Sequence, residues 1–149
     1  MSTALVGPFA IAPVVAQLRT IPALRKVAGV ADLAAATADA TPQTPAAYVM
    51  VSQERARSQD QGASGALVQM IDVSVTIALA VRNYASRGEI HAEELADTLR
   101  DVRAAVLNWQ PDGADLPFEL TEGRLLQFTA QTLWWAEVYR TSYSLRITP

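Results

Sequence analysis

The sequence predicts an α+β domain: a largely antiparallel sheet of four to five strands with two main helices packed on one face. Three patterns predict this class. Apolar and polar side chains alternate over residues 71–82, which is typical of a strand with one covered face. An apolar stripe at helical spacing runs from Leu95 to Trp109. Large apolar side chains at alternate positions over residues 133–147 predict a long last strand.

The N-terminal part of the chain predicts two helical pieces and two strands. Apolar side chains recur at helical spacing over residues 10–20, which indicates the first helix. Residues 24–30 indicate a short strand. Asp32 is expected to cap a brief helix over residues 33–38. After a turn-rich stretch, residues 46–52 predict the second strand.

A polar segment over residues 53–64 separates two of the expected strands. It contains no β-branched side chain, so we expect a long hairpin loop there. Hairpin loops usually have about two to five residues, and loops much longer than this often carry function. The alternative is a solvated connector. Arg55 and Arg57 within it are either solvated charges or contacts to a partner ring or to DNA.

The second half of the chain predicts one long helix between strands. Residues 83–88 are expected to form the turn after the central strand, and the following helix ends at Pro111. A further strand is expected between Phe118 and Phe128, with a bend at Gly123.

Composition limits the class of protein. The 149 residues fit one domain spanning the whole chain. Charged residues make up 18 %, below the ~25 % common in soluble domains, and apolar residues reach 50 %. Some apolar surface is therefore expected to be covered by a partner. A net charge of −3 argues against a sequence-independent nucleic-acid binder.

Several other classes are disfavoured. The absence of cysteine excludes disulfides and thiolate chemistry. No apolar run approaches the ~18 residues of a membrane span. Pro8 and Pro13 interrupt the apolar stretch that a signal peptide would need, so synthesis in the cytoplasm is expected.

No group of residues predicts an enzyme, a cofactor site or a metal site. His91 is the single histidine, and no serine or cysteine motif accompanies it as a nucleophile. The acidic residues over 93–101 fit a solvated helix face better than a metal cage, whose ligands usually come from several segments. The scattered glycines form no phosphate-binding loop.

The adjacent Trp134 and Trp135 are expected to point to opposite faces of the last strand. Most large apolar residues of that strand stand at odd positions, so Trp135 is assigned to the core. Trp134 is then assigned to the outer face, where a subunit interface would cover it. Single-stranded nucleic acid could also stack there, but a stacking platform normally comes with a basic groove.

Seven short segments in order resemble the tail terminator family of long-tailed bacteriophages. Each segment is weak alone, and together they span most of the chain. They are IPALR at 21–25, GVADLAAA at 29–36, TPAAYV at 44–49, LAVRN at 79–83, LNWQP at 107–111, GRL at 123–125 and LWW at 133–135.

The resemblance implies a structural virion protein without enzymatic activity or cofactor. It would form a homohexameric ring at the head-proximal end of the tail, bind the last ring of tail-tube subunits, stop polymerisation and offer a surface to the head connector. DNA would pass through the lumen without specific binding, and no membrane would be involved. Trp134, Arg55, Arg57 and Arg82 are the residues assigned to interfaces.

Two alternatives stay open at this point. One is another neck or head–tail completion protein of similar size. The other is a small-molecule-binding or enzymatic α+β domain, which would be a monomer or dimer with a concave apolar pocket.

Overall fold

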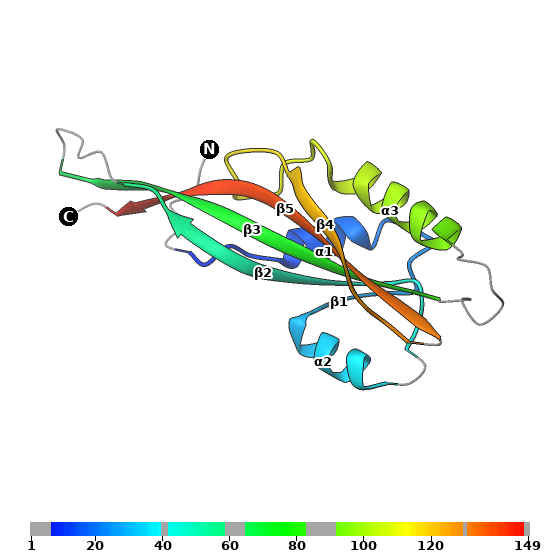
Figure 1. The fold of residues 1–149 in the computed structure, drawn as a ribbon. Coiled ribbons are helices and arrows are strands. Elements are labelled where there is room, and N and C mark those ends of the chain that lie inside the picture. Colours follow the sequence, from blue (N-terminus) through cyan, green and yellow to red (C-terminus); the bar gives the residue numbers. More distant parts are fainter. Residues whose placement is uncertain (1–6, 40–41, 59–64, 83–91, 130, 148–149) are drawn as a thin grey trace.

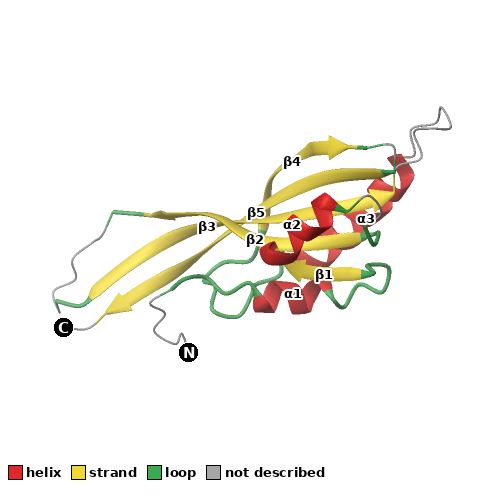
Figure 2. Ribbon diagram, turned by 90° about the horizontal axis from the view of Figure 1, so that it is seen from below, coloured by secondary structure: helices red, strands yellow, loops and turns green. Residues whose placement is uncertain are grey.

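The structure is a computed structural model, and it describes residues 7–39, 42–58, 65–82, 92–129 and 131–147. Five strands form one open sheet in the order β1-β2-β3-β5-β4 (Figures 1 and 2). β1 and β2 are parallel and the other neighbours are antiparallel. The elements are α1 (Ala12–Leu18), β1 (Lys26–Gly29), α2 (Val30–Ala38), β2 (Ala46–Ala56), β3 (Leu67–Arg82), α3 (Ala92–Val106), β4 (Glu119–Phe128) and β5 (Thr132–Ile147).

The main core lies between the sheet and the two helices α1 and α3. Val14 of α1 and Val102 of α3 are fully buried against the branched side chains that alternate along β3. This packing confirms the α+β class, the apolar stripe of the long helix and the expected placement of two main helices on one face. None of the described helices is long and apolar enough to cross a membrane.

The third helix, α2, lies on the opposite face of the sheet from α3 (Figure 1). It packs Ala36 against a second apolar cluster of small and aromatic side chains from β2, β3 and β5. The expected capping role of Asp32 is wrong. The helix begins at Val30 with Gly29 at the N-cap, so Asp32 lies inside the first turn, where a negative charge suits the helix dipole.

Beyond the helices, β2, β3 and β5 continue as a three-stranded extension, here called the arm (Figures 1 and 2). In the arm, residues 53–56 of β2 pair with residues 71–74 of β3. The expected loop over residues 53–64 is therefore wrong in its first part, because backbone pairing with β3 outweighs the weak strand propensity of these polar residues. Residues 59–64 lie outside the described part of the chain, as does the turn expected over residues 83–88.

β4 and β1 are the two outer strands of the sheet, and they lie at opposite edges (Figure 2). β4 pairs with β5 alone, and its pairing shifts between Leu120 and Glu122 and again between Leu125 and Gln127. The two shifts lie on either side of Gly123, where the sequence predicts a bend.

Candidate functional site

The face of the sheet opposite α1 and α3, here called the outer face, has a covered part and an open part. α2 covers the part near β1. The open part carries a polar groove of about 1000 Å³ that crosses β2, β3, β5 and β4. Its charged lining includes Arg55, Arg57, Asp72, Glu119 and Arg140. Most of the residues that line the groove are polar or charged, so it is suited to contact another macromolecule rather than to enclose a small apolar ligand.

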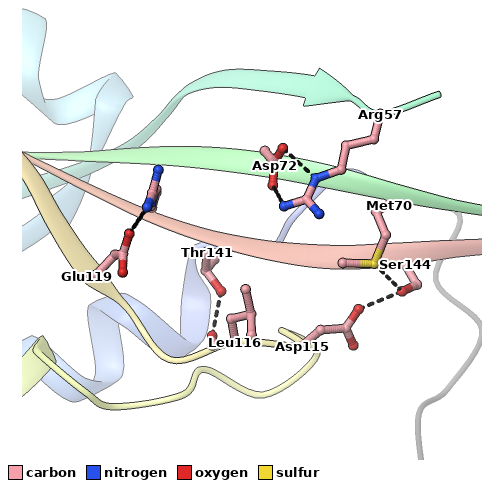
Figure 3. Close-up of polar contacts among 9 residues, drawn as sticks. Arg57, Met70, Asp72, Asp115, Leu116, Glu119, Thr141 and Ser144 are labelled. Atoms are coloured by element: carbon pink, nitrogen blue, oxygen red, sulfur yellow. Dashed lines mark hydrogen bonds and ion pairs between the residues drawn. The ribbon is translucent and has the colours of Figure 1, made fainter.

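Arg57 is held in place across the arm by Asp72 (Figure 3). Its Nε and Nη2 atoms donate to Oδ2 and Oδ1 of Asp72 at 2.8 and 2.7 Å. This hydrogen bonding lowers the pKa of Asp72 below its usual value. Both side chains are exposed, so the pair contributes little to stability and acts mainly to orient the guanidinium.

A second ion pair joins Arg140 of β5 to Glu119, the residue directly opposite on β4. Next to it, the loop between α3 and β4 is fastened to β5 (Figure 3). The Thr141 hydroxyl donates to the carbonyl of Leu116 at 2.5 Å, and the Ser144 hydroxyl contacts the Asp115 carboxylate at 2.6 Å. These contacts therefore hold the groove-lining residues Leu116, Glu119 and Arg140 in fixed positions.

The structure brings together only part of the predicted interface set. Arg55 and Arg57 both lie in the groove on the arm. Arg82 is exposed at the far end of β3, ten positions from Asp72. At ~3.3 Å per residue this separation is roughly 33 Å, so Arg82 belongs to a different surface.

The expected exposure of Trp134 is wrong. The two tryptophans do point to opposite faces, and Trp135 does pack against the main core. However, Trp134 is only 3 % exposed, because α2 and its neighbours cover that part of the outer face. Its ring lies 5.8 Å from the ring of Tyr48, centroid to centroid. The subunit itself covers this side chain, and no partner is needed for it.

A buried carboxylate that the sequence analysis missed lies under α3. Glu137 of β5 is fully buried. Arg103 donates to it through Nε and Nη2 at 2.6 and 3.2 Å, and Trp135 Nε1 donates at 3.1 Å. These contacts raise the pKa of Arg103, chiefly through the hydrogen bond to Glu137. The sequence does contain a sign of this site, because Glu137 interrupts the apolar odd positions between Trp135 and Tyr139.

This carboxylate also accounts for the glycine in β4. Gly123 lies directly opposite Glu137 in the β4–β5 pairing. A Cβ atom at Gly123 would be 2.4 Å from Oε2 of Glu137 and 3.0 Å from Cζ2 of Trp135. The glycine therefore lets the edge strand pass closely over the buried ion pair.

At the arm, the N-terminal segment is fastened through Glu54. The backbone N–H of Phe9 donates to Oε1 of Glu54 at 3.1 Å, and the Tyr143 hydroxyl contacts both carboxylate oxygens at 3.1 Å. Burial, followed by the hydrogen bond to Glu54, raises the pKa of Tyr143 to about 12.

This pKa predicts a loss of stability at high pH. The folded state holds the Tyr143 proton more tightly than the unfolded chain, where the tyrosine pKa is about 10. The stabilisation is complete below pH 10 and disappears as the pH rises toward about 12. The free energy of unfolding of the wild type, measured with urea, should therefore fall more steeply between pH 10 and 12 than that of Tyr143→Phe. Parallel curves for the two proteins would contradict the assignment.

Within the described residues, no three His, Cys, Asp or Glu side chains gather as metal ligands would. His91 lies outside this part of the chain. Of the acidic residues over 93–101, Asp97 forms an exposed ion pair with Arg100 at 3.0 Å, one helical turn away.

Comparison with known proteins gives one family. A family model described as "Phage tail terminator protein" matches residues 4–149, which include every helix and strand of the fold. No curated protein matches the chain.

Proposed function

The chain belongs to the phage tail terminator family, and from this premise we propose that it forms a homohexameric ring which caps the tail tube. The family makes it a structural component of the phage tail. In our proposal the ring sits at the head-proximal end, ends polymerisation of the tube and presents a surface to the head connector. The protein acts there without a cofactor. The match over nearly the whole chain is the observation that carries the proposal.

The shape and surface of the subunit support assembly. The sheet is open, and the arm extends beyond the helices, so part of each subunit is available to reach a neighbouring ring (Figure 1). Arg55 and Arg57 lie on this arm and are proposed to lie at interfaces, either with a neighbouring copy in the ring or with the tube or connector. Arg82 is proposed to contact a partner at the other end of β3. Such contacts set register more than affinity.

We further propose that DNA passes through the ring without specific binding. The net charge of −3 gives no general attraction to phosphate. Two of the groove arginines, Arg57 and Arg140, are already engaged by carboxylates of the same chain.

An amber mutation in the gene for this protein tests the proposal. In a non-suppressing host, electron microscopy should show tails longer than normal and without heads, because nothing stops the tube or offers the joining surface. Supplying the wild-type protein from a plasmid should restore normal length and attached heads. Tails of normal length that fail to join heads would instead indicate a head-side neck protein. Normal virions would contradict both functions.

A further inference from the structure

We propose that the sheet continues from one subunit to the next: β4 of one copy pairs antiparallel with residues 50–56 of β2 in a second copy. This inference rests on the proposed ring and names the surfaces that would close it. It follows from the two unoccupied edges of the sheet, their directions and their charges.

The first edge is β4. It is ten residues long, and all but one of its residues are exposed. Its outer backbone groups have no strand beside them in the described part of the chain. It also carries three exposed apolar side chains, with Leu125 at 47 %, Leu126 at 45 % and Phe128 at 66 %. Edge strands that stay single are usually protected by lysine, proline, other charged side chains or bulges. β4 has no lysine or proline, and its protection is limited to three charged side chains and two shifts of pairing.

The second edge is the arm portion of β2. β1 pairs only with Ala46 to Val49 of β2, so residues 50–56 have no strand beside them among the described elements. The residues from Ser52 to Ala56 are exposed. The sheet therefore has two different free edges on opposite sides. Pairing of unlike surfaces is head-to-tail, which produces a ring when the rotation closes.

Strand direction agrees with this pairing. β2 and β3 are antiparallel, as are β3 and β5, and β5 and β4, so β2 and β4 run in opposite directions within one subunit. A neighbour related by rotation about an axis along the strands keeps its direction. Its β2 then meets β4 in the antiparallel sense.

Charge selects the register. On the outer face, β4 presents Glu122 and Arg124, and β2 presents Gln53 and Arg55. Neither Glu122 nor Arg124 forms an ion pair within the described subunit. An antiparallel alignment with Glu122 opposite Arg55 sets Arg124 opposite Gln53. A parallel alignment of the same pair would oppose Arg124 and Arg57, and like charges directly opposite are destabilising.

The same register also brings one pair of large apolar residues together. Counting along the antiparallel pair from Glu122 and Arg55 brings Leu126 beside Val51, which is half-buried. Within one subunit, Glu122 pairs with Val138, Val138 with Thr76, and Thr76 with Met50. Glu122 and Met50 therefore stand at the same height along the sheet. Neighbouring copies are therefore offset by about five residues, the kind of stagger that tilted strands need to close a ring.

Cysteine cross-linking tests the inference cleanly because the chain has no cysteine. Glu122→Cys and Arg55→Cys are combined in one chain and supplied to the amber mutant, and purified tails are oxidised. The matched control combines Glu119→Cys with Arg55→Cys. We expect the first pair to give a covalent ladder up to six subunits on a non-reducing gel. The control and each single variant should give no ladder.

Other outcomes overturn the inference in distinguishable ways. Six-subunit rings on tails of normal length without a ladder would reject this edge pairing and leave the proposed function intact. A dimer from Glu122→Cys alone would show β4 pairing with β4. A ladder only from the Glu119→Cys pair would reject the register. A protein that never joins tails would count against the proposed function as well, and the amber phenotype tests that separately.

Discussion

Replacing Trp134 by alanine is expected to lower the free energy of unfolding by about 3–5 kcal/mol, the usual cost of removing a buried tryptophan side chain. Trp134 packs under α2 and its ring lies tilted against the ring of Tyr48, so its removal leaves a cavity between the helix and the outer face. Urea unfolding followed by circular dichroism would measure the change. Trp134→Phe should recover part of the loss, because it keeps an aromatic ring beside Tyr48.

Phe128→Ala is the matched control for this substitution. Phe128 is also an aromatic residue at the β4–β5 side of the sheet, but it is largely exposed. Its removal should change the stability of the isolated subunit by no more than about 0.5 kcal/mol. If Trp134→Ala were equally mild, α2 would not be packed on the outer face as described.

The tryptophan pair shows what the alternation along a strand can predict and what it cannot. Alternation along a strand predicts that Trp134 and Trp135 point to opposite faces, and the structure confirms this. What covers each face depends on distant segments. The parallel connection from β1 to β2 passes through α2, and this places the helix over Trp134. A short alanine-rich helix gives little sign of that role in the sequence.

In the arm, the sequence predicts a loop where the structure has a strand. Residues 53–56 lack the side chains that favour strands, so local propensity predicts a loop. They form a strand because residues 71–74 supply a backbone ladder and Asp72 supplies a partner for Arg57. The helix order, the central strand and the two-helix layer were predictable because their periodicity is long and regular. The polar groove was not, since it joins residues from four strands.

Replacing Arg103 by methionine is expected to cost about 2–4 kcal/mol of stability. Removing one partner of a buried ion pair costs about 3–5 kcal/mol, because the other charge stays buried without a partner. Glu137 is fully buried, whereas the Arg103 side chain is 39 % exposed and its contribution is screened, so the expected cost is about 1 kcal/mol below that range at each end. Chemical denaturation at pH 7 would measure this cost.

The double variant Arg103→Met with Glu137→Leu separates the charge effect from simple loss of contacts. With both partners apolar, no uncompensated carboxylate stays under α3, so the double variant should be more stable than Arg103→Met alone. The double-mutant cycle should then give a coupling energy of about 1–3 kcal/mol. A coupling near zero would mean that the hydrogen bonds from Trp135 and Tyr139 satisfy Glu137 without Arg103. Since Gly123 of the edge strand passes over this carboxylate, the same ion pair also helps to position β4, the strand that we propose to pair with a neighbouring copy.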